Sequence, residues 1–275
     1  MFELYKYFSH LSNSYVVTLD ILCVGGIITS AEYLAANKHF RTEGIYSWKI
    51  FSSRSNFINS TFFKRLDFLF SYSGFLLCQA IRIVSCLSIP FVENRFLKAL
   101  LLFLLSISYL ISSYRDVVGH DGSDQMSTII SVTCFISFLV NDSVVFKIGL
   151  IFLAIQSIIS YTIAGIAKLL SYKWRAGVAI GQIMNTRSYG HRGIAYFLIK
   201  ASPAVNLIIC WSTIIFEVMF FFVIFLPPPW CFIFLIIGFL FHAYNAIIMG
   251  LNNFFWSFTA TYPAIIFLNH LVNLN

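Results

Sequence analysis

The strongest constraint on this chain is a series of long apolar segments separated by short polar ones. Of its 275 residues, 59% are hydrophobic and 11% are charged, and the mean hydropathy is +0.83. A helix needs about 20 predominantly apolar residues to cross a bilayer. Segments that approach or meet this length lie at 66–89, 97–114, 126–141, 148–170, 204–226, 231–250 and 254–269. The sequence therefore predicts an all-α, polytopic membrane bundle.

A further segment, 15–36, is apolar apart from Asp20 and Glu32. Acids inside a membrane are costly and usually face the bundle interior. This segment therefore either crosses the membrane with its acids turned inward or lies flat in the interface. We favour a span, which gives about seven to eight spans, at about 20 residues each. They fill one transmembrane domain over 1–275 and leave no soluble domain.

Basic residues are concentrated in two polar loops, 37–65 and 171–203. Membrane proteins keep an excess of Lys and Arg in their cytoplasmic loops. We therefore expect both loops to be cytoplasmic, both chain ends to be outside, and the protein to lie in the plasma (inner) membrane. This distribution accounts for the net charge of +7 without nucleic acid. Membrane lipid is the expected partner.

Metal binding is not indicated by the sequence. The six cysteines lie in or beside apolar segments without Cys-x-x-Cys spacing, as small hydrophobic side chains do. The loop at 119–125 contains His120 and two Asp, but it does not match a twelve-residue calcium loop with a terminal Glu. We expect this loop to cap the next helix through Ser123 or Asp124.

The most informative ionisable residue in an apolar segment is Lys168. Helical spacing places Tyr161, Ala164 and Gly165 on the same face as Lys168. Small residues on that face allow another helix or a ligand to come close. Two interpretations are open. Lys168 is either a desolvated amine that acts as a base, or an anchor that extends to the headgroups with the basic residues that follow it.

Other polar side chains fall inside the predicted spans. His242 and Asn245 lie one turn apart near the middle of their span. They either orient a quinone, carbonyl or carboxylate, or hydrogen-bond a neighbouring helix. Arg82 and Glu217 are expected to form structural ion pairs with each other or with the acids of segment 15–36.

A longer pattern combines several of these residues. It consists of Ala164-Gly165-Ile166-Ala167-Lys168-Leu169, then Trp174 and Gly177, then His242-x-x-Asn245 and Pro263. In this order, over about 155–265, the chain resembles the membrane part of vitamin K-dependent gamma-carboxylase. It likewise resembles the mostly bacterial relatives of that enzyme, the horizontally transferred transmembrane (HTTM) family. The resemblance implies a helical membrane bundle.

The resemblance also implies a chemistry. Its cofactor is a reduced quinone, vitamin K or menaquinol, which Lys168 deprotonates with assistance from His120. Residues expected to bind the substrate or cofactor are Tyr161, Trp174, His242 and Asn245. Oxygen adds to the quinone, and the strong base so formed removes a proton from a glutamate of a peptide or protein substrate, which takes up carbon dioxide. One cavity is expected to contain Lys168, His120 and His242, because topology places them toward one membrane face.

Two other functions stay open. One is a noncatalytic accessory membrane protein for maturation, export or immunity of a secreted peptide, which the resemblance implies for some short relatives. Such a protein should depend on loop surfaces such as 171–203 rather than on Lys168. The other is a small-molecule transporter. Transporters pair broken helices in matching halves, and the break at Pro227 to Pro229 has no counterpart in the first half of the chain.

Overall fold

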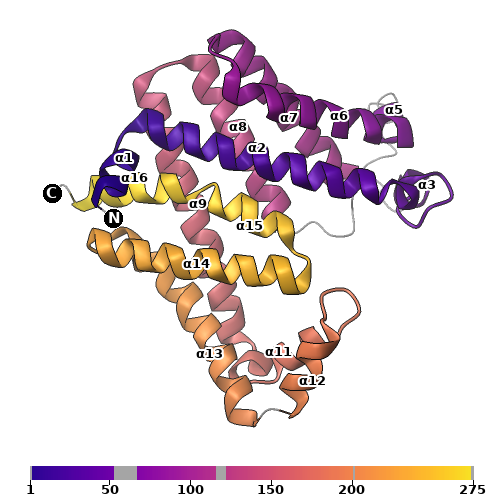
Figure 1. Ribbon diagram of the computed structural model, residues 1–275, viewed down its shortest axis with the longest axis vertical. Coiled ribbons are helices and arrows are strands. Elements are labelled where there is room, and N and C mark those ends of the chain that lie inside the picture. Colours follow the sequence, from indigo (N-terminus) through magenta and orange to yellow (C-terminus); the bar gives the residue numbers. More distant parts are fainter. Residues whose placement is uncertain (1, 53–66, 116–121, 201, 274–275) are drawn as a thin grey trace. The chain divides into compact units, whose positions relative to one another are not determined.

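The computed structural model describes residues 2–52, 67–115, 122–200 and 202–273, and this part of the chain is helical without a strand (Figure 1). The predicted all-α fold is confirmed. The helices are α1 (Phe2–Ser9), α2 (Leu11–Ala35), η1 (Asn37–Phe40), α3 (Trp48–Ser52), α5 (Asp67–Phe70), α6 (Tyr72–Ser88), η3 (Ile89–Phe91), α7 (Arg95–Arg115), α8 (Gly122–Val140), α9 (Ser143–Leu170), α10 (Tyr172–Arg175), α11 (Ala179–Met184), α12 (Arg192–Lys200), α13 (Pro203–Met219), η4 (Phe220–Ile224), α14 (Pro228–Met249), α15 (Asn252–Thr259) and α16 (Tyr262–Asn273).

Within the described residues, seven helical segments are long and apolar enough to cross a membrane. They are Leu11–Ala35, Tyr72–Phe91, Arg95–Arg115, Gly122–Val140, Ser143–Leu170, Pro203–Ile224 and Pro228–Met249. Six correspond to the clearest predicted segments. The first confirms our preference for a span at 15–36. The chain is therefore a multi-pass membrane protein.

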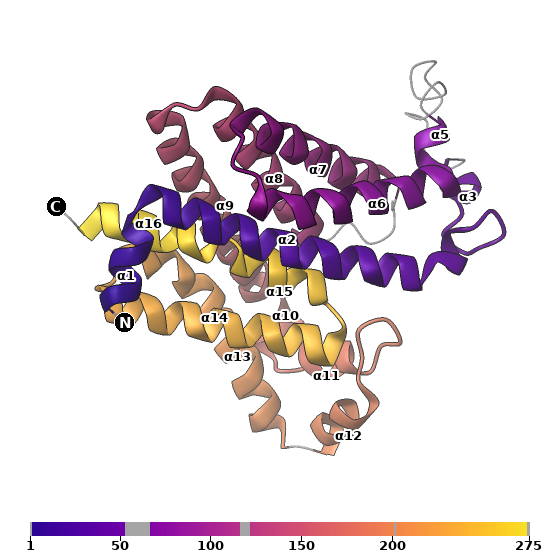
Figure 2. The ribbon, with the colours of Figure 1, turned by 45° about the horizontal axis from the view of Figure 1, so that its top comes forward.

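The prediction of a single spanning helix at 254–269 is wrong. Two short helices, α15 and α16, take its place, with a turn at residues 260 and 261. Pro263 has no N–H to donate to the carbonyl of Thr259, so a continuous helix would lose a hydrogen bond and meet a steric clash. Proline is tolerated in the first turn of a helix, where Pro263 lies in α16. Both helices pack against α14, and Figures 1 and 2 show them running back along it.

The chain divides into two compact units. One unit comprises Met1–Ser14 and Leu150–Asn275, and the other comprises Tyr15–Gly149. The chain passes from one to the other within α2 and again within α9. The prediction of one transmembrane domain over 1–275 stays a prediction.

The unit Tyr15–Gly149 contains a buried arginine, Arg82 of α6, which is 1% exposed. Its Nε donates to Ser108 Oγ at 3.2 Å, and its Nη2 donates to the Ser108 carbonyl at 2.9 Å and to Ser112 Oγ at 2.7 Å. The guanidinium also lies 4.2 Å from the centre of the Tyr109 ring. The prediction that Arg82 forms an ion pair is therefore wrong. Serine oxygens one turn apart on α7 and an aromatic face bind the cation instead.

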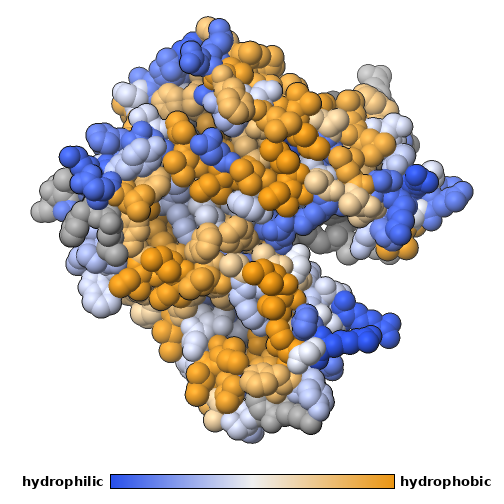
Figure 3. All heavy atoms as spheres, in the orientation of Figure 1, coloured by the Kyte–Doolittle hydropathy of each residue, from blue (hydrophilic) through white to orange (hydrophobic). Residues whose placement is uncertain are grey.

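The outer surfaces of the helices are rich in large apolar side chains. Phe91 is 85% exposed, Ile247 is 80% exposed and Leu170 is 74% exposed. Figure 3 shows hydrophobic residues extending over the helices on the face in view. Since water would disfavour such surfaces, these apolar helices contact membrane lipid. The plasma membrane as location, and the cytoplasmic side for the loops 37–65 and 171–203, stay predictions.

Candidate functional site

Lys168, in the last turn of α9, forms an ion pair with Glu217 of α13. Its Nζ donates to both carboxylate oxygens, at 2.8 Å to Oε1 and 2.6 Å to Oε2. The Lys168 side chain is 21% exposed and that of Glu217 is 5% exposed. Both residues lie within candidate membrane spans. The ammonium is thus directed at a buried carboxylate. The expectation that Glu217 would pair with Arg82 is wrong.

Trp174 also lies near the Lys168 ammonium. The Lys168 Nζ lies 5.3 Å from the centre of the Trp174 ring, within the range of a cation–π interaction. The half-buried Trp174 also packs against a small hydrophobic core formed by α11, α12 and α13. The predicted site residues Lys168 and Trp174 are therefore in contact. Through Trp174, the ion pair also contacts the hydrophobic core of α11, α12 and α13.

Gly165 explains how Glu217 comes so close to α9. A Cβ atom at position 165 would lie 2.7 Å from the backbone N of Val218 and 2.9 Å from the carbonyl carbon of Glu217. Only a residue without a side chain permits this approach of α13. The helical face of Tyr161, Gly165 and Lys168 faces α13 and the η4 turn that follows it, since Tyr161 stacks on Phe220 of η4 with ring centroids 3.8 Å apart. The close neighbour of this face is another helix.

A second polar cluster lies on the same face of α9. Tyr161 Oη is 2.7 Å from His242 Nε2 and 3.0 Å from Tyr262 Oη, which joins α9, α14 and α16 by hydrogen bonds. His242 is 4% exposed and Tyr161 is 3% exposed. The other imidazole nitrogen, Nδ1, is buried and has no hydrogen-bond partner among the described residues. A buried imidazole held by one nitrogen retains one site for a further hydrogen bond.

Packing around His242 fixes the orientation of its ring. The imidazole stacks on Phe258 of α15 with centroids 4.8 Å apart and planes 18° apart. Gly238 makes room for the Tyr262 phenol, since a Cβ there would lie 2.5 Å from Tyr262 Oη. The turn between α15 and α16 is bound to α9 by a hydrogen bond, which Thr261 Oγ1 donates to Ser157 Oγ at 2.8 Å. The break between α15 and α16 therefore lies beside the cluster, with Phe258 on one helix in contact with His242 and Tyr262 on the other in contact with Tyr161.

The remaining predicted site residues are not in these clusters. Asn245 is half-buried, and its backbone carbonyl accepts from Gly250 and Leu251 at the end of α14. Its side chain makes no hydrogen bond with the part of the chain that the structure describes. His120 lies outside the described residues. The expected cavity containing Lys168, His120 and His242 consequently stays a prediction, as do the roles of all these residues.

Two features of the site were missed from the sequence. Glu217 was recognised as an intramembrane charge, but nothing in the sequence spacing links it to a lysine 49 positions away. Tyr262 was not singled out, although it directly precedes the Pro263 of the pattern. A polar aromatic residue beside a helix-breaking proline in an apolar segment is the signal that was available.

In the ranges that the structure describes, no three His, Cys, Asp or Glu side chains form a group that could hold a metal ion. No protein-family model matches the chain, and neither a curated protein nor a solved structure matches it. Membership of the HTTM family therefore stays a prediction from the sequence pattern.

Proposed function

We propose that the protein is a membrane enzyme of the HTTM kind that binds a reduced quinone beside Lys168 and Glu217 and removes a proton from it. The observation that supports this proposal is the ion pair itself. A partly exposed ammonium and a buried carboxylate, in contact at 2.6 Å, lie inside two candidate spans. Ionisable residues within a membrane are expensive, and they commonly mark substrate or proton pathways.

The residues present fit the chemistry of a quinol. A quinol hydroxyl needs an acceptor, the charge left after proton removal needs a cation, and the flat ring needs an apolar or aromatic surface. Glu217 offers the acceptor, Lys168 the cation and Trp174 the aromatic surface. When bound, a reduced quinone supplies a phenolic proton and two electrons.

The ion pair modifies the role expected of Lys168. Because Nζ donates to both oxygens of Glu217, the ammonium form of Lys168 is the one that fits this contact. We therefore assign the proton acceptor to a carboxylate oxygen of Glu217. Lys168 holds that carboxylate in place and keeps a positive charge beside the oxygen that gives up its proton. The buried Tyr161 and His242 order the adjoining face of α9.

The test is quinone epoxide formation by purified protein in lipid nanodiscs, supplied with oxygen and either reduced vitamin K or menaquinol. We expect Lys168→Ala and Glu217→Gln each to lower the rate by at least about 100-fold, the lower end of general acid–base effects. Lys173→Ala, which removes an exposed lysine just beyond α9, is the matched control and should retain full activity. Equal rates for the parent and Lys168→Ala would refute the proposal.

A second candidate function is the noncatalytic accessory protein. The observation that favours it is that both oxygens of Glu217 are already occupied by Lys168, as in an ion pair whose role is to clamp two helices. The exchanged pair, Lys168→Glu with Glu217→Lys, separates the two functions. If the ion pair serves only to hold the two helices together, the exchanged pair should give as much folded protein as the parent, and the parent should form no epoxide. An enzyme should stay inactive in the exchanged pair even when it folds.

A further inference from the structure

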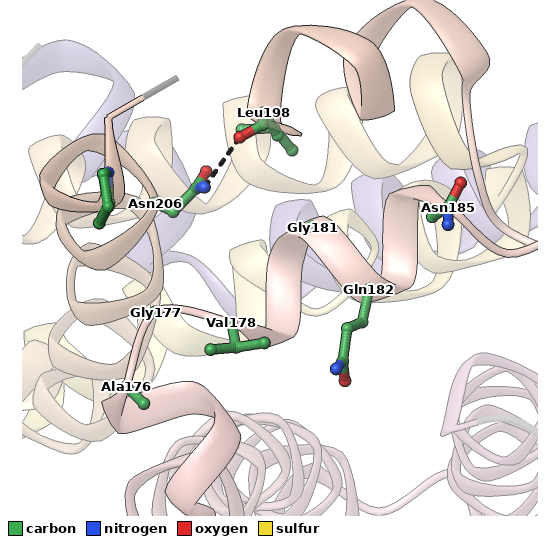
Figure 4. A pocket seen from close by; sticks show the side chains of 9 residues that line it. Ala176, Gly177, Val178, Gly181, Gln182, Asn185, Leu198 and Asn206 are labelled. Carbon is green, nitrogen blue, oxygen red and sulfur yellow. Dashed lines mark hydrogen bonds between the residues drawn. The ribbon is translucent and has the colours of Figure 1, made fainter. Parts of the chain in front are cut away.

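The segment that follows α9 forms much of an open pocket that the proposed quinol chemistry does not use. Its volume is about 400 Å³, and it lies between α11, α12 and the first turn of α13. Figure 4 shows its lining, which includes Gly177, Gly181, Gln182, Asn185, Leu198 and Asn206. Neither Lys168, Glu217 nor His242 lines it. This volume is within the usual range for small-molecule sites.

The walls of the pocket are held in place by packing. Ala179, Met184, Leu198 and Cys210 belong to one buried core that joins α11, α12 and α13. The pocket is kept open at Gly181, where a Cβ atom would meet nothing within 4 Å. The pocket is therefore bordered by packed helices, and a side chain at position 181 would have room to extend from its lining.

The polar groups of the pocket are amides. Asn206 donates from Nδ2 to the carbonyl of Leu198 at 2.9 Å, and this bond fixes which end of the amide is nitrogen (Figure 4). Its Oδ1 is buried and accepts no hydrogen bond from the described residues. Gln182 and Asn185 add exposed amides at the rim. The pocket thus offers a buried acceptor to a hydroxyl or N–H donor, and no charged residue lines it.

The charged residues of the surrounding segment are basic, and none of them lines the pocket. The segment 171–203 contains five basic residues and no acid. Arg175 directly precedes a lining residue, Ala176, and Arg187 follows Asn185 by two positions. Both arginines are exposed. Two exposed arginines therefore lie next to the lining residues along the chain, and the lining itself is neutral.

The position of the pocket indicates the source of such a ligand. Asn206 lies in the first turn of the candidate span Pro203–Ile224, where a span meets the headgroup layer. Further along the same helix, Ile208 is 64% exposed, and on α12 Phe197 is 62% exposed. Apolar surface for acyl chains therefore adjoins the pocket. Lys and Arg residues close to the end of a membrane helix attract anionic lipid headgroups.

We infer that this pocket binds an anionic phospholipid whose headgroup carries hydroxyl groups, as in phosphatidylglycerol. In this arrangement the phosphate lies toward Arg175 and Arg187, a headgroup hydroxyl donates to Asn206 Oδ1, and the acyl chains follow the exposed face of α13. The inference uses no residue of the Lys168–Glu217 pair, so it stands or fails independently of the proposed function.

The experiment is native mass spectrometry of delipidated, purified protein to which lipids are returned. Phosphatidylglycerol is compared with phosphatidic acid of the same acyl chains, which is anionic but lacks the headgroup glycerol. We expect the parent to prefer phosphatidylglycerol by about tenfold. Gly181→Leu, which fills the pocket, should remove this preference. Gly193→Leu, a glycine-to-leucine change on α12 outside the lining, should retain it.

A second variant keeps the test informative if Gly181→Leu does not fold. Gln182→Ala truncates an exposed amide at the rim and should also weaken the preference. Equal binding of both lipids by the parent would overturn the inference and indicate a general basic surface. Unchanged preference in folded Gly181→Leu would overturn it as well. If neither lipid binds and an uncharged peptide binds instead, the inference is overturned and the pocket belongs to a different class of ligand.

Discussion

Gly165 of α9 lies directly against the backbone of Glu217 on α13. A Cβ at position 165 would come within 2.9 Å of the Glu217 carbonyl carbon, and within 2.7 Å of the next backbone nitrogen. One turn further along α9, Lys168 reaches the Glu217 carboxylate at 2.6 Å. The close approach of the two backbones therefore sets the distance across which the ion pair forms.

We expect Gly165→Ala to destabilise the protein. The atoms that the new methyl group would meet belong to the α13 backbone, which cannot rotate away as a side chain can, so the helices must separate. Overpacking of this kind costs about 1–3 kcal/mol. Thermal unfolding in detergent micelles measures the effect. Gly181→Ala is the control, because a Cβ there meets nothing within 4 Å and alanine favours helix. Equal melting temperatures for the two variants would contradict the prediction.

Replacement of Arg82 tests how a buried cation is accommodated without an acid. Arg82→Lys keeps the charge but loses the planar fork that reaches Ser108 and Ser112. Arg82→Met removes the charge and retains similar length. We expect the Lys variant to lose about 2 kcal/mol, in the range of hydrogen bonds to charged groups. The Met variant should be the more stable of the two. Equilibrium unfolding in mixed micelles compares them, and a Lys variant as stable as the parent would refute this account.

The apolar segments allowed most of the fold to be predicted, since the length and hydropathy of a membrane helix are set by the bilayer. The failure at 254–269 has a local cause. Its apolar composition is that of a span, but Pro263 interrupts the backbone ladder, and Thr261 bonds to Ser157 of another helix. A hydropathy value is an average over the whole segment, so it does not show the turn at residues 260 and 261.

The candidate site was predictable along one helix but not between helices. The period of 3.6 residues correctly placed Tyr161, Gly165 and Lys168 on one face. The partner of Lys168 depends on the register between α9 and α13, which is set by the contact at Gly165 and has no sequence signature. Glu217 was therefore assigned to the wrong partner, Arg82. The same limit applies to the hydrogen bond between Tyr161 and Tyr262.

Tyr5 of α1 provides a test that depends on pH. Its hydroxyl donates to Asn269 Oδ1 at 2.9 Å, and burial, with a smaller contribution from Cys231, raises the pKa of Tyr5 from 10.0 to about 12. The folded state thus holds the proton more tightly than the unfolded state. The stability that this group contributes is full below about pH 10 and is lost as the pH rises toward 12.

We therefore expect the melting temperature of the parent to fall more steeply between pH 9 and 12, roughly the interval of this titration, than that of Tyr5→Phe. The phenylalanine variant should be less stable below this interval because it lacks the hydrogen bond to Asn269. Lysines and other tyrosines that titrate in the same range are common to both proteins, so the difference between them isolates Tyr5. Parallel curves would show that the Tyr5 hydroxyl does not stabilise the fold.

The contact between Tyr161 and His242 is best tested by a double-mutant cycle. Tyr161→Phe leaves neither nitrogen of the buried His242 with a partner in the described chain, which should cost about 1–3 kcal/mol. His242→Phe added to it removes the orphaned imidazole and keeps a ring stacked on Phe258. Replacing both partners by apolar groups of similar shape can be nearly neutral. The double variant should thus be more stable than the sum of the single losses predicts. Additive losses, measured by unfolding in mixed micelles, would show that the hydrogen bond does not couple α9 to α14.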